Sequence, residues 1–240
     1  MTYSELQVTT HFSFLRGVSS CEELFATAAA MGMPALGITD RNAVTGLVRA
    51  LYAAEQLRKT SGIEIGFVPG CRLDLVTGSS LLVWPEDLAG WSQLTSLLTR
   101  GNKRADPRAG EKGQCFLYWE DLAGSTGNLV ASLVPGPGGP DEADLRWMAD
   151  IFTEGRGHVC LTHRRRGDDA RRLWLAGQAA RAHGLAPLAT GDVLYHHPDR
   201  RMLQDVVTAI RRKCTVDELG LRRERSADRA LQTPQEMARR

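Results

Sequence analysis

The chain has 240 residues, of which 42% are hydrophobic and 24% are charged, and its formal net charge at pH 7 is +2. These values are typical of a folded globular protein with a sizeable core, and they exclude a disordered chain or a fibrous repeat. No apolar run approaches the roughly 20 residues that a membrane-spanning helix needs, and the polar N-terminal residues show no secretory signal. We therefore expect a cytoplasmic protein with no membrane partner.

The charges are distributed unevenly along the chain. Residues 1–155 hold 12 basic and 18 acidic side chains, whereas residues 156–240 hold 18 basic and 10 acidic ones. Arginine supplies 26 of the 30 basic residues, and its guanidinium is a rigid fork of donors that suits phosphate. Genome base composition would explain the preference for arginine over lysine, but it does not explain the clustering of positive charge in the last third of the chain.

The cysteines indicate a reducing environment. They are odd in number and widely spaced, without a C-x-x-C pair, which favours buried thiols over a disulfide framework or a zinc ribbon. The five residues are Cys21, Cys71, Cys115, Cys160 and Cys214.

The first hundred residues alternate between predicted strands and helices. A strand is expected at Glu5–Thr9, and Ser20 with Glu23 forms a capping box in front of the first helix. This β-α-β-α-β order is typical of a parallel sheet with helical crossovers. Further strands are expected at 35–39, 63–68, 72–76 and 81–84, a second helix with Val44, Leu47, Val48 and Leu51 on its apolar face, and a third at 86–99 with Leu88, Trp91, Leu94 and Leu98 on its core face.

The alternation resumes after a charged loop at 101–114. About seven strand-helix units in 200 residues predict an α/β barrel or a doubly wound sheet, with functional residues at the carboxyl ends of the strands. The last thirty residues are highly charged and poor in apolar side chains. Strands are expected at 129–134, 158–162 and 187–190, helices at 141–152 and 168–183, and a turn at 135–140.

Polar residues follow several predicted strands, and five collinear stretches that hold them match a known family. These stretches are Ser4–Gly17, Ala35–Asn42, Gly90–Arg104, Arg166–Asp169 and Leu188–Gln204. They resemble the polymerase and histidinol phosphatase (PHP) domain that opens bacterial C-family DNA polymerases, nearest to their error-prone, damage-inducible branch. The likeness runs from about residue 3 to the C-terminus, where Thr233–Met237 matches a segment that leads toward the palm domain in the family.

The resemblance implies both an architecture and a parent protein. The expected fold is α/β, a PHP-type distorted (β/α)7 barrel that is TIM-like, over residues 1–210, followed by a charged helical linker at 211–240 toward a polymerase palm. The parent would be a DNA-directed DNA polymerase that copies damaged template, with magnesium, dNTPs and DNA bound elsewhere and mutagenesis accessory proteins as candidate partners. We expect no cofactor and no catalytic residue within the present chain.

The resemblance also identifies the positions that hold metal ligands in metal-binding members of the family. The opening H-x-H pair falls on Gln7 and Thr9, and three further ligand positions carry arginine, which cannot bind a divalent cation. Asp192 is kept. We therefore expect a pocket without a metal and reject a metal-dependent phosphoesterase or proofreading exonuclease. The vestigial pocket positions are Gln7, Thr9, Arg16, Asp40, Arg41, Arg72, Ser80, Asp192 and Leu194.

Two hypotheses describe what the altered pocket does. In the first, Arg16, Arg41 and Arg72 pair with Asp40 and Asp192 and replace the metal as internal struts, because a buried carboxylate without a partner is unfavourable. In the second, the surplus guanidinium charge binds phosphate or a DNA end.

Other basic residues form a candidate nucleic-acid surface. For the run at 164–172 the alternative is a solvated helix start in which Asp168 and Asp169 complement the helix dipole. For His196 and His197 we expect a surface or turn position rather than a metal site. The candidate phosphate or DNA contacts are Arg164, Arg165, Arg166, Arg200, Arg201, Arg211 and Arg212.

Two rival functions remain open from the sequence. A stand-alone metal-dependent PHP phosphoesterase would bind two or more zinc or manganese ions and cleave phosphate esters. An interaction module without any catalytic partner domain would do neither.

Overall fold

A computed structural model describes residues 2–104, 114–124 and 128–240, so the expected charged loop at 101–114 lies mostly outside the described residues. Within them, seven strands form one sheet in the order β1 to β7. The strands are β1 (Glu5–Val8), β2 (Ala35–Arg41), β3 (Gly66–Asp74), β4 (Ser80–Pro85), β5 (Leu129–Val134), β6 (Gly157–Leu161) and β7 (Ala186–Ala189). The helices are α1 (Cys21–Ala30), α2 (Leu47–Ser61), α3 (Leu88–Lys103), α4 (Trp119–Leu122), α5 (Glu142–Ile151), α6 (Asp169–Ala182), α7 (Arg201–Arg212) and α8 (Pro234–Arg239), with 3-10 turns η1 (Pro198–Arg200) and η2 (Asp217–Arg222).

The sheet is mixed, which corrects the expectation of a parallel one. β1, β2 and β3 pair in parallel, as do β5, β6 and β7, but β4 runs antiparallel to both of its neighbours. No crossover helix separates β3 from β4, because the chain reverses in a tight turn where Leu75 N–H donates to Ser79 O at 2.8 Å. The strands expected at 63–68 and 72–76 are in fact the single strand β3.

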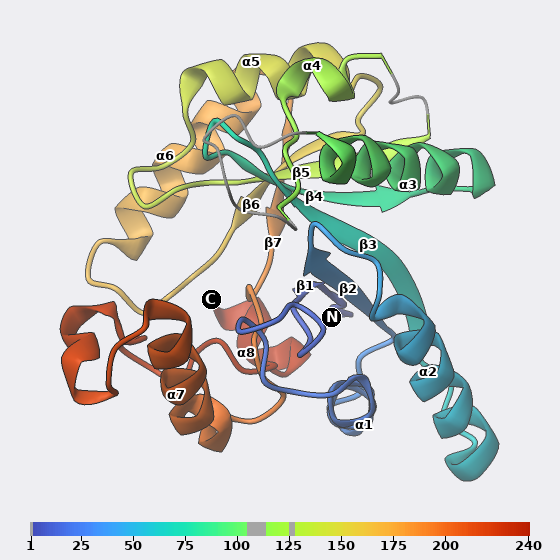
Figure 1. The fold of residues 1–240 in the computed structure, drawn as a ribbon, viewed down its shortest axis with the longest axis vertical. Coiled ribbons are helices and arrows are strands. Elements are labelled where there is room, and N and C mark those ends of the chain that lie inside the picture. The colour runs from blue at the N-terminus through green and yellow to red at the C-terminus, as the bar shows by residue number, and fades with distance from the viewer. Residues whose placement is uncertain (1, 105–113, 125–127) are drawn as a thin grey trace.

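The sheet curls so that its two ends meet (Figure 1). Val193, which follows β7, forms a parallel bridge with Val8 of β1. Thr9 N–H donates to Val193 O, and Val193 N–H donates to Gln7 O, both at 2.9 Å. With helices around the outside of this sheet, the fold is the expected α/β, TIM-like distorted barrel.

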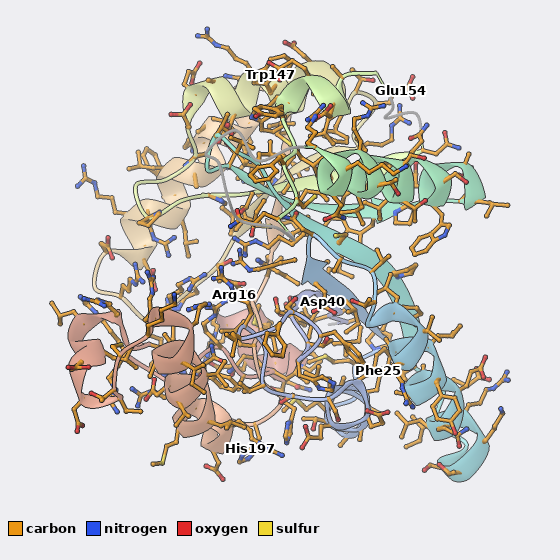
Figure 2. The ribbon with its side chains drawn as sticks, in the orientation of Figure 1. Arg16, Phe25, Asp40, Trp147, Glu154 and His197 are labelled. Carbon is orange, nitrogen blue, oxygen red and sulfur yellow. The ribbon has the colours of Figure 1, made fainter. Side chains whose placement is uncertain are left out.

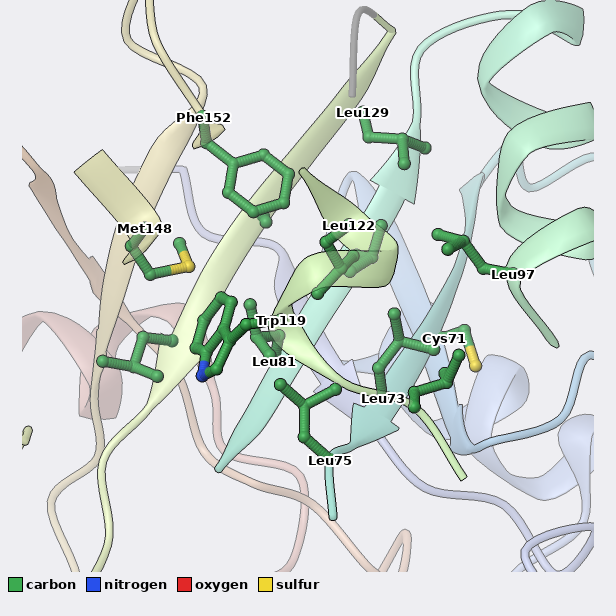
Figure 3. Close-up of a cluster of buried hydrophobic side chains, with 14 of the residues drawn as sticks. Cys71, Leu73, Leu75, Leu81, Leu97, Trp119, Leu122, Leu129, Met148 and Phe152 are labelled. Atoms are coloured by element: carbon green, nitrogen blue, oxygen red, sulfur yellow. The ribbon is translucent and has the colours of Figure 1, made fainter. Parts of the chain in front are cut away.

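The two largest apolar clusters of the described residues fill the space between sheet and helices. The larger one joins strands β3 to β6 with α3, α4 and α5, and Figure 3 shows Trp119 and Leu122 of the short helix α4 packed into it. The second joins β1 and β2 with α1 and α2. The capping box is confirmed: Glu23 N–H donates to Ser20 Oγ at 3.1 Å, and Ser20 N–H donates to the Glu23 carboxylate at 2.9 Å.

Two helix faces differ from the expected ones. In α2 the expected Leu47 is buried, but Val48 and Leu51 are exposed, and Ala50, Ala53 and Ala54 are buried in their place. Small side chains at this contact permit α1 and α2 to pack closely. In α3, Leu88 is exposed because it is the first helical residue and precedes the face that holds Leu94, Leu97 and Leu98.

The last thirty residues pack onto the barrel. Helix α7 spans the boundary that we expected at residue 210. Farther on, Leu194 N–H donates to Arg229 O at 2.9 Å, Tyr195 bridges to Ala230, and both Ala230 and Leu231 are buried. Residues 229–231 are therefore packed against the barrel, and the role of residues 211–240 as a connection to a palm domain remains a prediction.

Candidate functional site

A network of ion pairs is centred on Asp192, directly after β7. The Asp192 carboxylate is buried and accepts from Arg229 at 2.8 Å, from Arg164, and from Gln7 Nε2 at 3.1 Å, with Arg72 Nη1 at 3.6 Å. Burial alone would raise the pKa of Asp192, but the three guanidinium charges outweigh it and hold the pKa far below its ordinary value. This carboxylate is therefore ionised and fully paired.

A second carboxylate, Asp74 at the end of β3, extends the network. It pairs with Arg41 and with Arg72 Nε at 3.1 Å, and it accepts from Ser80 Oγ. Because Arg72 also lies beside Asp192, it bridges Asp74 and Asp192. Arg72 donates to Ser80 Oγ at 3.1 Å as well. Burial and the neighbouring charge of Arg72 lower the pKa of Arg41 to about 10, which leaves it charged at neutral pH.

Asp40, at the end of β2, is held in a different way. Its buried carboxylate accepts from Thr10 N–H and Thr10 Oγ1, both at 2.8 Å, and from Ser13 Oγ at 2.7 Å. Gly46 approaches so closely that a Cβ there would lie 2.6 Å from Asp40 Oδ2. Burial raises the pKa of Asp40 despite these hydrogen bonds. The expected pairing of Asp40 with arginine is wrong, because hydroxyl and amide donors of the loop after β1 occupy its oxygens.

The other pocket positions are divided between the network and the core. Gln7 and Thr9 are buried on and just after β1, and Gln7 Oε1 has no partner within the described residues. Arg16 and Asp40 both lie near the middle of the molecule (Figure 2), but no ion pair of Arg16 is found in the described part of the chain. Leu194 packs with Val18 in a small apolar cluster.

Three site residues escaped the sequence-based assignment. Asp74 and Arg229 complete the ion-pair network. Glu5 lies beside it, buried, and accepts from Tyr3 Oη at 2.7 Å and Gly191 N–H at 2.8 Å. Burial raises the pKa of Glu5 to about 7. A carboxylate inside a buried strand was the one available signal for Glu5, whereas Arg229 is 37 positions away from Asp192 and carried none.

The candidate DNA-contact arginines differ in how much of their charge is already paired. Arg165 pairs with Asp228 and Glu236, Arg200 with Glu23, and Arg201 approaches Asp205 at 3.7 Å. Arg164 belongs to the Asp192 network. Arg166 and Arg212 are exposed, and no side-chain partner of either is found among residues 2–104, 114–124 and 128–240.

The start of α6 is less solvated than expected. Asp168 is exposed and makes no capping hydrogen bond, but Asp169 is buried. Asp169 accepts from the backbone N–H groups of Arg164 and Arg166 at 2.8 and 2.9 Å and from Arg172 at 2.6 Å. It therefore fixes the 164–166 turn rather than merely complementing the helix dipole.

The two adjacent histidines take separate positions. His196 is half-buried and contacts Ser19 Oγ at 2.8 Å, whereas His197 is exposed beside Asp199. They do not converge on one point.

The side chains of the pocket do not fit a divalent metal. Within the described ranges, no three His, Cys, Asp or Glu side chains gather so as to hold an ion. The nearest carboxylates, Asp74 and Asp192, already accept from arginines, and a guanidinium offers only donors and positive charge to a cation. We therefore derive no chemical step through a metal at this position.

The network forms the floor of a cleft of about 760 Å³. Arginines from β2, β3, the segment after β6, α6 and residue 229 line it, and Trp119 of α4 and Trp147 of α5 line it as well.

No helix in the described residues is long and apolar enough to span a membrane.

Comparison with known proteins connects this geometry to a family. The chain is 48% identical over 242 residues to error-prone DNA polymerase 3 of Agrobacterium fabrum and 41% identical over 240 residues to an error-prone DNA polymerase of Caulobacter vibrioides. These two matches include 100% and 99% of this chain, respectively, but 21% of the length of each relative. The chain thus spans about a fifth of the length of these curated relatives.

Solved structures show the same fold at low sequence identity. A protein named as a metal-dependent phosphoesterase, from Bifidobacterium adolescentis, superposes with a TM-score of 0.56 and 15% identity over 80% of this chain and 87% of that one. An amidohydrolase from Chromobacterium violaceum gives a TM-score of 0.52 and 18% identity over the same shares. The PHP domain pattern itself matches residues 5–159, which is more than half of the sequence. By this match, and by the barrel that carries it, the chain belongs to the PHP domain family.

Proposed function

We propose that this chain is the PHP domain of an error-prone DNA polymerase and that it has a structural rather than a hydrolytic role. The parent would synthesise DNA across lesions during repair and mutagenesis, in the cytoplasm, with DNA, magnesium and dNTPs bound by residues outside this chain. Its partners would include DNA and mutagenesis accessory proteins. Identities of 40% or more over the entire chain to error-prone polymerases support this proposal.

One observation carries the structural role. Asp74 and Asp192 are joined through Arg72 and are neutralised by Arg41, Arg164 and Arg229. These pairs connect the ends of β2, β3, β6 and β7 with the segment at 229. In the proposed role the guanidinium groups hold the rim together where metal ions would do so in metal-dependent relatives.

Arg72→Ala tests the strut role, because it removes the residue that bridges both carboxylates. We expect a clear drop in the melting temperature of the chain. Arg146→Ala is the matched control, since Arg146 is exposed on α5 and, within the described residues, pairs only with Glu142 of its own helix. An unchanged melting temperature in Arg72→Ala would show that the pairs are not struts.

Metal content and hydrolysis test the rival phosphoesterase. We expect the purified chain, incubated with zinc or manganese and then dialysed, to retain less than one equivalent and to leave a generic phosphodiester intact. Two or more equivalents together with hydrolysis would favour the phosphoesterase. Separately, primer extension past an abasic site by the full-length gene product, with magnesium and dNTPs, tests the polymerase assignment.

A further inference from the structure

Helix α7 has its polar side toward the barrel and its apolar side toward solvent. The Asp205 carboxylate is buried and lies 3.7 Å from Arg201 Nη2 and 3.4 Å from Arg223 Nε. Gln204 Nε2, also buried, donates to Thr208 Oγ1 at 3.5 Å. A helix on the surface of a globular protein ordinarily turns its apolar side to the core, so the arrangement in α7 is the reverse of the usual one.

Four apolar side chains form the exposed side of α7. Met202 is 78% exposed and Ile210 is 57% exposed, while Leu203 and Val206 between them are 41% and 43% exposed. Met202, Val206 and Ile210 are spaced four residues apart, so they form one ridge along the helix. Figure 1 shows α7 at the outside of the molecule. A continuous apolar surface of this kind is typical of a protein contact.

The shape of the ridge indicates a helix as the partner. Ridges of residues spaced four apart interdigitate with the grooves of a second helix in the commonest class of helix packing, and amphipathic helices dock through anchors at this spacing. A lipid surface matches less well. The aromatic side chains that anchor interfacial helices in the headgroup layer are absent from the sequence of α7, residues 201–212.

The charge at the end of α7 indicates the sign of the partner. Arg212 and Lys213 are exposed, and neither has an ion-pair partner within the described ranges. A second copy of this chain does not complement them. In a parallel contact between two copies of α7 they would face each other, and in an antiparallel contact they would face Arg200 and Arg201. Carboxylates beside the apolar stripe of a different protein would complement them.

We propose that the exposed side of α7 docks an amphipathic helix of a separate protein, one whose apolar stripe is flanked by acidic residues. The stripe packs along Met202, Val206 and Ile210, and the carboxylates lie against Arg212 and Lys213. This contact is independent of the polymerase assignment, since it requires only the surface of the chain itself.

Fluorescence anisotropy with two designed peptides tests the proposal. Each is a labelled helical peptide of about 18 residues, long enough to form a helix, with leucines spaced three and four residues apart. The positions beside the leucines carry glutamate in one peptide and lysine in the other. We expect the 240-residue chain to bind the acidic peptide at least tenfold more tightly than the basic one. Absence of binding at submillimolar concentration, or equal affinities for the two peptides, would overturn it.

Three variants locate the contact. Ile210→Glu should weaken the acidic peptide at least tenfold, and it should fold normally because the side chain is exposed. Val48→Glu is the matched control, an exposed apolar residue on α2 that should leave the affinity unchanged. Arg212→Glu should weaken the acidic peptide about fivefold and reduce the salt dependence of its binding. Normal binding by Ile210→Glu, or an equal loss in Val48→Glu, would show that the peptide binds elsewhere.

Three measurements separate this partner from other occupants of α7. The chain should sediment as a monomer and should not bind phosphatidylglycerol vesicles, and the full-length gene product should bind the acidic peptide as tightly as the chain does. Dimerisation or vesicle binding that Ile210→Glu abolishes would assign the surface to a second copy or to a membrane instead. Loss of peptide binding in the full-length product would show that the rest of that protein already covers α7. Any of these three results contradicts the proposal.

Discussion

Asp192 and Asp40 lie at the ends of two strands of the same barrel, and both are buried, yet their environments are opposite. Asp192 is surrounded by guanidinium groups from Arg72, Arg164 and Arg229. In the part of the chain that the structure describes, Asp40 accepts only from neutral donors, the hydroxyls of Thr10 and Ser13 and the backbone N–H of Thr10. The pKa of Asp192 is lowered and that of Asp40 is raised.

The difference shows that burial alone does not determine the charge of a rim carboxylate. Desolvation acts on both groups, but only full positive charges reverse its effect. The sign of the pH response follows. Stability from Asp192 is present above the ordinary aspartate pKa, near 4, and is lost as pH falls below it. The pKa of Asp40 is raised in the folded chain, so its burial costs less folding free energy as the pH falls and the carboxyl group takes up a proton.

Among the substitutions that test this difference, Asp192→Asn should cause the largest loss in the free energy of unfolding. The amide keeps the shape and tolerates the left-handed backbone at this position, where φ is 49°, but it removes the charge that three arginines share. We expect a loss of about 3–5 kcal/mol in the free energy of unfolding, as for other buried ion pairs with one partner removed. Urea denaturation at pH 7 measures it.

Asp168→Asn is the matched control for that measurement. Asp168 is exposed at the start of α6 and makes no capping hydrogen bond, so we expect a change within about 0.5 kcal/mol. Similar losses in Asp168→Asn and Asp192→Asn would contradict the assignment of Asp192 as the centre of the network.

Glu5 offers a pH test on a third carboxylate, one that lacks an arginine. Burial raises the pKa of Glu5 to about 7 in the folded chain, while an unfolded glutamate titrates near 4.3. The folded state therefore binds more protons between these values, and stability should increase as pH falls from about 8 to 5. The expected gain is on the order of 2–3 kcal/mol.

Denaturation curves at several pH values check this prediction. Glu5→Gln should remove the slope, whatever its effect on stability at one pH. Tyr3→Phe should move the slope to higher pH, because the Tyr3 hydroxyl donates to Glu5 at 2.7 Å and lowers its pKa. A flat wild-type profile across this range would refute the neutral form of Glu5.

Much of the fold could be predicted from the sequence because local signals and the tertiary structure agree at many positions. The capping box of Ser20 and Glu23, the buried strand at 35–39 and the polar residues after the strands are all found where we expected them. The antiparallel β4 was missed because a short turn at 75–79 has no periodic signal. The exposure of Val48 and Leu51 in α2 was missed because the close contact with α1 buries the alanines of α2 instead.

The site was only partly predictable. Family positions placed Arg41, Arg72 and Asp192 at one rim, and they do meet there. The partner of Arg41 is Asp74, 33 positions away, and nothing in the sequence distinguishes Asp74 from Asp40 as its acceptor. Arg41 pairs with Asp74 because the hydroxyls of Thr10 and Ser13 already donate to the Asp40 carboxylate. The acceptor of Arg41 therefore depends on the three-dimensional course of the loop after β1.

Ser13→Ala tests the hydroxyl side of the comparison. It removes a donor to Asp40 at 2.7 Å and an acceptor for Arg41 N–H at 2.9 Å, both at a buried position. We expect a loss of about 1–2 kcal/mol, since two buried polar groups lose a partner. The loss should shrink at low pH, where Asp40 is protonated and needs fewer donors. A loss that is as large as that of Asp192→Asn would remove the distinction between the two carboxylates.

Arg200→Ala should give the smallest effect and sets the lower limit of the comparison. The pair between Arg200 and Glu23 connects η1 to the start of α1, but the side chains are 40% and 32% exposed. Water and salt screen such a pair, so we expect a loss below about 1 kcal/mol that decreases further at 1 M salt. Denaturation at low and high salt provides the check. Because the network around Asp192 is buried, its contribution should persist at high salt, and a loss in Arg200→Ala that also persisted would mean that exposure does not separate the two kinds of ion pair.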